Sequence, residues 1–511
     1  MRDPCMPRAS EASPGGLPRA SEARRGVSRR RLLQSAGGVF AASAFRPGLG
    51  FAPADAAEVS DVMTTLSTFM GGAASRALPD AVVEKTKFMI LDTLAAMISG
   101  SELPPGRFAI QFAKANAGNN PVCSVAGSPV RCGPMDAALA NGILAHSDET
   151  DDTHPPSQSH PGCAAVPAAL AVGEKFAIDG TRFVRSVALG YDVGTRVTAT
   201  LGKLQYMFES HRSTHGIAGN FVAAAAAGCA AGLNTQQMRW LLSYAAQQAS
   251  GLASWQRDVD HIEKAFDFGG MAARNGVTAA LLVQAGGTGV DDVLSGTDNF
   301  FQGFVPKNNP GMIVEALGTR FEVMRTDIKK WTVGAPIQAP LDALDVLIKR
   351  ERFDASQVKQ VVVRVATDEA AIVNNREISD INLQHLVAVM LLDKTVSFKA
   401  AHDVGRMKDQ AVLRERAKVR LVPDDELEKL MPQRTAIVEV TLADGRTVRE
   451  RVGTVRGTAA NPMPKAEVIA KARDLIAPVL GAATFQKLSD TVFGLESVKN
   501  LNDLRPLIQK G

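Results

Sequence analysis

The stretch "GNFVAAAAAGCAAGL", residues 219–233, decides the fold of this chain. Its alanines favour a helix, and its apolar residues cover nearly every side of that helix. The stretch is shorter than the roughly 20 strongly apolar residues that a membrane-spanning helix needs. A helix of this kind is buried by neighbouring helices, and the stretch therefore predicts the centre of a helical domain.

The sequence around this stretch carries helical patterns as well. Residues 79–100, for example, read "PDAVVEKTKFMILDTLAAMISG". Four of their apolar residues recur near one helix face: Val83, Ile90, Leu94 and Met97. Patterns of this type continue to about residue 320, and we expect a large all-helical domain over residues 57–320.

The pattern changes after residue 320. "VKQVVVRVA" at 358–366 and "TAIVEVTLADGRTVRERVG" at 435–453 alternate between apolar and polar residues, as strands do. Asp444-Gly445 is a hairpin turn signal inside the second segment. Because helical patterns separate the two segments, we expect a smaller α+β lid domain over residues 321–455.

The last part of the chain, residues 456–511, is helical again, and Pro464 suits the first turn of a helix there. We expect these C-terminal helices to return to the helical domain and pack on it. The predicted fold class is therefore mainly α, with a large all-helical domain and a smaller α+β lid.

The distribution of charge excludes one class of partner. The chain has 57 Lys and Arg and 53 Asp and Glu, but residues 1–56 alone hold nine Arg and four acidic residues. The remainder has 48 basic and 49 acidic residues, which gives no basic field of the kind that nucleic acid binding needs. We expect a small-molecule ligand, no nucleic acid and no stable membrane span.

Residues 1–56 contain an export pattern. "SRRRLL" at 28–33 resembles a twin-arginine signal, and the apolar run Leu32–Phe45 is too short to span a membrane. "ADA" at 54–56 offers a cleavage site of small residues. We expect export to the periplasm and a mature N-terminus near Ala57; a basic tail is the alternative.

The polar segment "NGILAHSDETDDTHPPSQSHPG", residues 141–162, holds three of the eight histidines of the chain: His146, His154 and His160. Four carboxylates lie between the first two, and the prolines forbid one continuous helix. Three interpretations stay open. The segment is an acid–base site, a zinc or iron site built on the three histidines, or a solvated polar loop.

Three further segments carry candidate polar groups. "ESHRSTHGIAGNF" at 209–221 precedes the alanine-rich helix, whose N-terminus favours an anion. "SWQRDVDHIEKAFDFGGMAARNG" at 254–276 contains Lys264, and "TDIKKWTVGAPIQAPLDAL" at 326–344 contains Lys329. Taken singly, each of these lysines is an ordinary solvated charge.

Taken together and in this order, the four segments resemble the MmgE/PrpD family from about residue 60 to residue 500. The polar segment 141–162 is the most specific block of the resemblance. The resemblance implies a helical domain with an α+β lid, a homodimer, and activity on small polycarboxylates without a metal or an organic cofactor.

The resemblance also implies roles for individual residues. Acid–base catalysis falls to four positions: His160, His215, Thr153 and Glu149. Substrate binding falls to four more: Lys264, Lys329, Asp152 and Arg212. His211 is an alternative to His215, because the spacing varies in this block.

This sequence departs from the family pattern at several positions. Glu149 stands where relatives often have Asp, Gln338 stands where they often have His, and the tyrosine of the family's lid has no evident match.

The predicted function is that of a cofactor-free carbon–oxygen lyase similar to 2-methylcitrate dehydratase. One histidine would remove a proton next to a carboxylate and the other would protonate the leaving hydroxyl, while lysines stabilise the negative charge. A decarboxylase or an epimerase of the same family would use similar groups. Two hypotheses of a different class also stay open: an exported carboxylate-binding protein without turnover, and a metal enzyme built on the three histidines.

Overall fold

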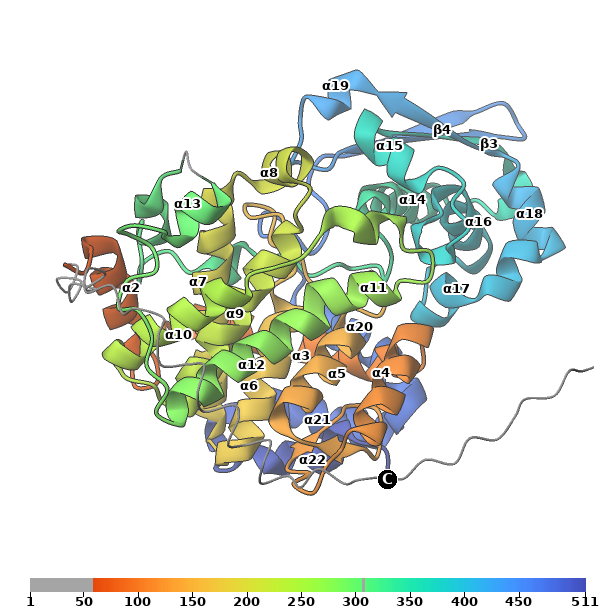
Figure 1. Ribbon diagram of the computed structural model, residues 1–511. Helices are drawn as coiled ribbons and strands as arrows, with labels where there is room; N and C mark the ends of the chain where they lie inside the picture. Colours follow the sequence, from red (N-terminus) through yellow and green to blue (C-terminus); the bar gives the residue numbers. More distant parts are fainter. Residues whose placement is uncertain (1–57, 306–307) are drawn as a thin grey trace, which may run out of the picture. The chain divides into compact units, whose positions relative to one another are not determined.

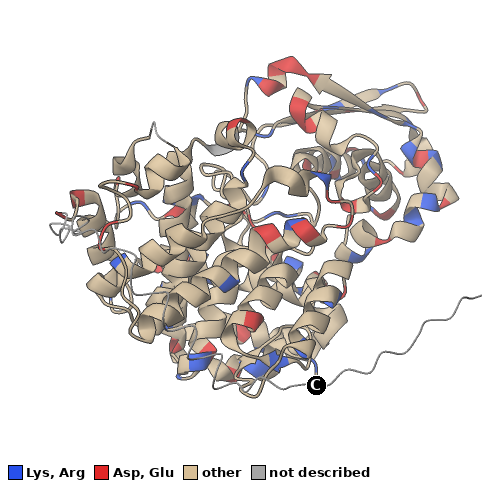
Figure 2. Ribbon diagram, in the orientation of Figure 1, with Lys and Arg blue, Asp and Glu red and all other residues tan. Residues whose placement is uncertain are grey.

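The alanine-rich stretch forms most of helix α9, Thr214–Ala231, and this helix is buried along nearly its whole length. It begins where the side chain of Ser213 accepts a hydrogen bond from a backbone amide, and it ends at Gly232 in a left-handed conformation. No charged residue occurs in it (Figure 2). Its most extensive contacts are with α6 (Gly162–Phe176), α7 (Gly180–Leu201) and α12 (Met271–Gln284).

The computed structural model describes residues 58–305 and 308–511, and the predicted leader of residues 1–56 lies outside this range (Figure 1). The described chain is mainly helical, which confirms the predicted fold class. The other α-helices before residue 320 are α2 (Asp61–Gly71), α3 (Asp80–Gly100), α4 (Pro104–Ala115), α5 (Pro134–Ala145), α8 (Lys203–Ser210), α10 (Thr235–Gln248), α11 (Ile262–Ala265) and α13 (Phe300–Phe304). Two short strands, β1 (Cys123–Ser124) and β2 (Arg131–Cys132), pair between α4 and α5.

The segment after residue 330 contains the second sheet of the described chain. Its strands are β3 (Val358–Ala366), β4 (Val419–Asp424), β5 (Ala436–Leu442) and β6 (Thr447–Val452), in the spatial order β4-β3-β5-β6. The strand at 358–366 and the hairpin at 435–453 are confirmed, with Gly445 at a positive φ in the turn. β4 was not predicted, and it pairs with β3 in parallel.

Short helices accompany this sheet, and α14 and α16 contact its strands. The helices are α14 (Gln338–Glu351), α15 (Thr367–Val373), α16 (Leu383–Asp393), α17 (Phe398–His402), α18 (Gln410–Arg416) and α19 (Asp425–Glu428). The chain ends in α20 (Lys465–Leu480), α21 (Ala482–Phe493) and α22 (Arg505–Ile508).

Buried apolar side chains of the described residues form two hydrophobic cores. The first takes its residues from Met63 to Ile328 and again from Met463 to Ile508, so the C-terminal helices do return to the helical part. The second lies within Trp331–Val455 and joins the sheet to its helices. The chain passes from one core to the other at residues 328–331. This passage contains Lys329, a predicted substrate-binding residue.

A π-helical turn, Phe266–Gly270, lies between α11 and α12. Such turns insert one extra residue and often occur at functional sites. Gly269 lies against Gly142 of α5 so closely that a Cβ on either glycine would lie under 2.5 Å from a backbone oxygen of the other. The absence of side chains at both positions lets α5 and the π-helical turn meet, and this contact places the C-terminal end of α5 beside Phe268.

No helix within residues 58–305 and 308–511 combines the length and the apolar character that crossing a membrane requires.

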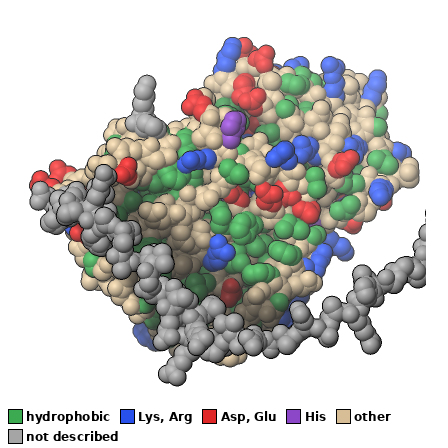
Figure 3. Space-filling view, in the orientation of Figure 1, with side chains coloured by type: hydrophobic (Ala, Val, Ile, Leu, Met, Phe, Trp, Pro, Cys, Tyr) green, Lys and Arg blue, Asp and Glu red, His purple; other side chains and the backbone are tan. Residues whose placement is uncertain are grey.

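On the face drawn in Figure 3, hydrophobic side chains gather over α4 and α5, where Phe108, Phe112 and Met135 are exposed. The homodimer that the resemblance implies stays a prediction.

Candidate active site

The loop between α5 and α6 places two imidazoles on one carboxylate. Nδ1 of His146 lies 2.9 Å from Asp151 Oδ2, and Nδ1 of His160 lies 3.2 Å from Asp151 Oδ1. Burial alone would raise the pKa of Asp151, but the two imidazoles hold it well below its usual range. The ionised Asp151 therefore forms a hydrogen bond with Nδ1 of His146 and faces Nδ1 of His160 at ion-pair distance, and this arrangement leaves Nε2 of His160 for proton exchange.

Burial also affects His160 itself, because it lowers the pKa of the ring while Asp151 opposes the shift. The ring is thus a neutral base in the unliganded site. Its side chain is 12 % exposed, whereas that of His146 is fully buried. Of the two rings on Asp151, His160 is the one that a dissolved substrate can reach.

Phe268, from the π-helical turn, forms the floor of the site. Its ring stacks on His215 at 4.0 Å and on His146 at 4.5 Å between ring centroids. His261 lies 5.3 Å from His146. Burial lowers the pKa of His215 well below its usual range and that of His261 to about 3, so both rings are neutral.

Two lysines meet at Glu149, two residues before Asp151. Lys264 Nζ contacts Glu149 Oε1, and Lys329 Nζ donates to the Glu149 carbonyl at 2.7 Å. Lys329 Nζ also lies 3.8 Å from Asp151 Oδ1. Burial would raise the pKa of Glu149, but the two lysines hold it well below its usual range. Two cations from separate parts of the chain therefore stand beside the imidazoles, where they can bind an anion.

Five of the predicted site residues thus lie in one connected cluster: His160, His215, Glu149, Lys264 and Lys329. Thr153 contacts the segment just before the lid. Its backbone forms two hydrogen bonds with the backbone of Asp327, at 2.7 and 3.1 Å. Thr153 Oγ1 is buried and, among the described residues, has no hydrogen-bond partner. This hydroxyl is available to a ligand.

Asp152 and Arg212 have different neighbours. Asp152 accepts hydrogen bonds from Tyr191 Oη at 2.5 Å and from the Gly162 amide at 3.0 Å. Burial and the neighbouring Asp151 raise the pKa of Asp152 to about 7. The guanidinium of Arg212 lies over the ring of Phe304, 4.6 Å from its centroid. The Asp152 carboxylate is therefore held by Tyr191 and Gly162, and the Arg212 side chain points toward α13.

Two more residues matter to the resemblance: His211, the alternative to His215, and Gln338, which stands where relatives often have His. Both lie away from the imidazoles. His211 is exposed, with a positive φ, and its carbonyl accepts a hydrogen bond from Ala253. The amide of Gln338 bonds the backbone of Trp331 and Val333 and so shapes the start of the lid. Of His211 and His215, it is His215 whose ring lies 5.4 Å from that of His160.

The site built on three histidines does not form. His154 turns away from the other two, with Nδ1 2.6 Å from Ser157 Oγ and Nε2 3.1 Å from Glu322 Oε2. The physical reason is the fold of the loop, because the His154–Ser159 backbone bridge points the ring at Glu322. The metal interpretation of His146, His154 and His160 is therefore wrong.

Another possible metal group is His146, Asp151 and Cys163, whose ligand atoms lie within 4.8 Å of one another. The thiol of Cys163 donates to the His160 carbonyl at 3.1 Å. Burial, with Asp151 next in effect, raises the thiol pKa well above its usual value. Because the thiolate is the form that binds metals, these residues fit a metal poorly.

The lid adds His402 to the site, a residue that the sequence did not single out. Its Nε2 lies 2.8 Å from Asp148 Oδ2 and 3.7 Å from Asp380 Oδ2, and its Nδ1 lies 2.8 Å from the Phe398 carbonyl. Burial would lower the pKa of His402, but Asp148 and Asp380 raise it to about 9. A buried ion pair therefore joins the lid to the loop between α5 and α6.

We expect His402→Gln to weaken the pH dependence of stability above neutrality. The pKa of His402 rises from about 6.5 unfolded to about 9 folded, so its stabilisation is complete below pH 6.5 and is lost as pH rises through 9. The thermal midpoint of the wild type should fall more steeply between pH 7 and pH 9 than that of the variant. Equal slopes would contradict the ion pair.

The control for this comparison is His385→Gln, in the core of the lid. Burial lowers the pKa of His385 to about 4, so this residue does not titrate between pH 7 and pH 9. His385→Gln should keep the steep wild-type slope, whatever it does to the midpoint itself.

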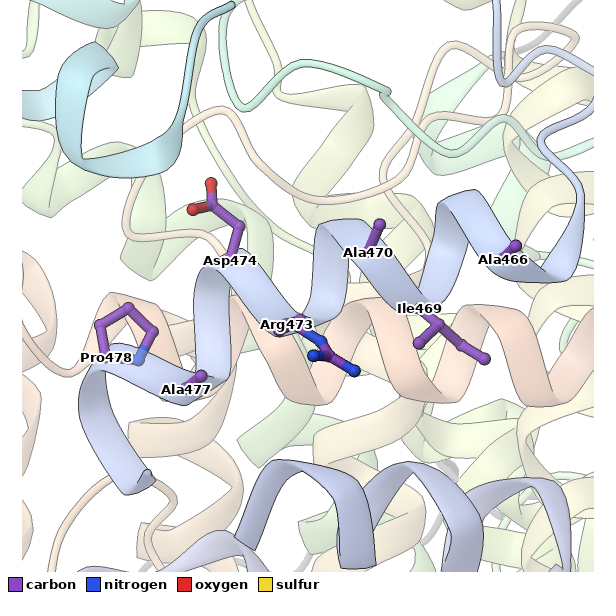
Figure 4. Close-up of a pocket in the computed structure, with 7 residues that line it drawn as sticks. All are labelled: Ala466, Ile469, Ala470, Arg473, Asp474, Ala477 and Pro478. Carbon is purple, nitrogen blue, oxygen red and sulfur yellow. The ribbon is translucent and has the colours of Figure 1, made fainter. Parts of the chain in front are cut away.

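Two cavities lie outside the imidazole cluster. One of about 520 Å³ is a groove on the outer side of α20, and Figure 4 shows Arg473 and Asp474 as its charged lining residues. The other, of about 210 Å³, adjoins His154, and its lining includes Arg320 and Arg325, which form ion pairs with Glu322. Neither has the combination of free imidazoles and cations that the cluster has.

Four site residues were missed as individuals: Asp151, His261, Phe268 and His402. The first three lie inside the segments 141–162 and 254–276, so the sequence located them without giving them roles. His146 was named, but as a possible metal ligand. His402 had no signal in the sequence, because nothing local connects it with Asp148.

Comparison with known proteins adds to this geometry. Residues 64–312 match the model of the MmgE/PrpD N-terminal domain, and residues 331–494 match that of the MmgE/PrpD C-terminal domain. Similar proteins include the cis-aconitate decarboxylase of Aspergillus terreus, 25 % identical over 89 % of this chain and 97 % of that protein. The human cis-aconitate decarboxylase is 25 % identical over 88 % of this chain and 95 % of that protein. The cis-aconitate decarboxylase-like protein oryM of Aspergillus oryzae is 25 % identical over 84 % and 94 %.

Proposed function

This chain belongs to the MmgE/PrpD family, and from that premise we propose that it is a lyase that removes carbon dioxide from a small polycarboxylate similar to cis-aconitate. The observation that carries the proposal is the imidazole pair on Asp151 with two lysines beside it. The names of the relatives favour decarboxylation over the dehydration that the sequence first indicated.

The lysines supply the binding of carboxylates. Lys264 and Lys329 now contact Glu149, and a substrate carboxylate would compete with that side chain for them. Each charged hydrogen bond contributes roughly 1.5–3 kcal/mol to such binding. Thr153 Oγ1 and the buried Nδ1 of His215 offer further polar contacts.

The chemical step needs one proton and a place for negative charge. The bond between a carbon and its carboxylate breaks, carbon dioxide leaves, and the electron pair stays on the carbon skeleton until a proton joins it. Lys264 and Lys329 stabilise that charge while it exists. His160, whose pKa rises when an anionic substrate binds beside it, delivers the proton from Nε2.

Dehydration would use the same groups in another order. One imidazole would take a proton from carbon, and another would protonate the leaving hydroxyl. The site residues therefore do not separate the two reactions, and only the product does. A binding protein without turnover is the third possibility that the product test addresses.

The test is to incubate the purified protein with cis-aconitate, 2-methylcitrate and related acids and to follow the products by mass spectrometry. We expect a product that is lighter by one carbon dioxide, and the rate should survive extensive chelation because the donor atoms fit a metal poorly. A product that differs by one water would show a dehydratase. Binding with no change in either the mass or the configuration of the acid would show a binding protein.

Chelation separates acid–base catalysis from metal catalysis. If turnover stops on chelation and returns with one added metal, the acid–base assignment of the imidazoles is wrong. A metal that merely stabilises the protein would change the thermal midpoint and leave the rate unchanged.

A further inference from the structure

We propose that Lys471, on the C-terminal helix α20, is a positioning residue for the reaction, because it fixes the backbone of the catalytic loop between Glu149 and Asp151. The proposal rests on the proposed function of the site. Lys471 lies more than 300 positions from the loop in sequence, and no motif marks it.

The contacts of Lys471 are few and buried. Its Nζ lies 2.7 Å from Asp92 Oδ1 of α3 and donates to the Thr150 carbonyl at 3.0 Å. The side chain is 4 % exposed and that of Asp92 is 2 % exposed. An ammonium group with so little exposure to water loses most of its solvation, so these two acceptors are what retain it there.

Two lysines hold two successive carbonyls of the loop. Lys329, at the start of the lid, takes the carbonyl of Glu149 at 2.7 Å, and Lys471 takes that of Thr150 at 3.0 Å. The next residue is Asp151, which orients both imidazoles. Anchoring the two preceding peptide groups from different parts of the chain fixes the direction in which the Asp151 carboxylate points.

Helix α20 is itself tied to the lid. Asp474, one turn beyond Lys471, accepts a hydrogen bond at 2.8 Å from the backbone amide of Phe398, at the start of α17. α17 ends with His402, which pairs with Asp148. Helix α20 therefore contacts the loop through Lys471 and contacts α17 of the lid through Asp474. Figure 4 shows Asp474 projecting from α20.

The charge of Asp92 offers a competing explanation of any effect. Burial raises the pKa of Asp92, and Lys471 opposes that rise, so the lysine and the charge on Asp92 are linked. Removing the lysine alone would change both the anchoring of Thr150 and the charge next to Asp151. Removing both partners leaves only the loss of the anchor.

The experiment compares Lys471→Met with Lys87→Met. Lys87 is the control, because its side chain is also nearly buried, at 10 % exposed, and donates to a carbonyl, that of Phe493 at 2.8 Å; its ion-pair partner Glu496 is the more exposed acid. Both variants should lose thermal stability. We expect Lys471→Met alone to lower kcat, by roughly tenfold to a hundredfold, with little change in KM.

The double variant Asp92→Asn/Lys471→Met separates position from charge. If Lys471 acts by anchoring Thr150, the double variant stays slow even though no unpaired buried charge remains. Recovery of wild-type kcat would show that only the charge of Asp92 matters and would overturn the proposal. Equal kcat in Lys471→Met and Lys87→Met would overturn it as well.

A measurement that needs no turnover distinguishes failure of the proposed function from failure of this inference. Hydrogen exchange of the peptide that covers residues 147–153 should be faster in Lys471→Met than in the wild type and in Lys87→Met. If the wild type converts no acid of the panel, the proposed function fails, and the exchange rates still decide whether Lys471 anchors the loop. Unchanged exchange refutes the anchor.

Discussion

Replacing His160 by alanine is expected to lower kcat by about 10²–10⁴, the usual effect of removing a positioned acid or base. His160 is the more accessible ring of the pair beside Asp151, so its Nε2 is the group that can exchange a proton with a bound substrate. Lys264 and Lys329 remain in the variant. We therefore expect KM to change much less than kcat when both are measured with an active acid.

The control for this variant is His385→Ala. His385 is fully buried in the core of the lid and is absent from the contacts of the active site. Its truncation should lower the thermal midpoint and leave kcat near the wild-type value. The catalytic assignment of His160 is wrong if His160→Ala retains wild-type turnover, or if it loses turnover only because it unfolds.

Replacing Asp151 by asparagine is expected to reduce kcat by up to about 10⁴, which is the cost of losing a carboxylate that orients a catalytic imidazole. The asparagine amide has one acceptor and one donor group, whereas His146 and His160 both face the carboxylate with Nδ1. One ring would then meet an amide N–H and adopt the wrong tautomer. The charge that stabilises a protonated His160 would also be lost.

Two further variants test whether Asp151 works through His160. The double variant Asp151→Asn/His160→Ala should be hardly slower than His160→Ala alone, because residues that act as a unit are not additive. Additive losses would mean that Asp151 acts on the substrate by another route. Glu174→Gln is the control for replacing a buried carboxylate by its amide. Glu174 is buried and accepts a hydrogen bond from Ser124 Oγ at 2.6 Å, so its replacement should affect stability alone.

The periodic parts of the chain could be predicted from the sequence. α9, the strand at 358–366 and the hairpin at 435–453 formed where their patterns indicated them. Each pattern reports a face that must be buried, and this requirement is local to the element. β4 escaped prediction because its burial alternates weakly and its pairing with β3 is made across more than 50 residues.

The site was predictable as a set of segments and not as a set of contacts. The resemblance named His160, His215, Lys264 and Lys329, and the fold brings their segments together. It did not distinguish Asp151 from its neighbours. In an irregular loop the direction of each side chain depends on distant partners, and here those partners are His146, Tyr191 and the lysines.

By itself, then, the sequence determined which segments are helices and strands, because burial of an apolar face follows from residue spacing alone. It also determined which four polar segments are the candidates for the chemistry. Only the tertiary structure decided that Asp151, and not Glu149 or Asp152, joins the two imidazoles, that His154 turns to Glu322, and that His402 and Lys471 reach the loop. The physical reason is that these contacts join residues in loops without periodicity, or residues hundreds of positions apart, so no local pattern records them.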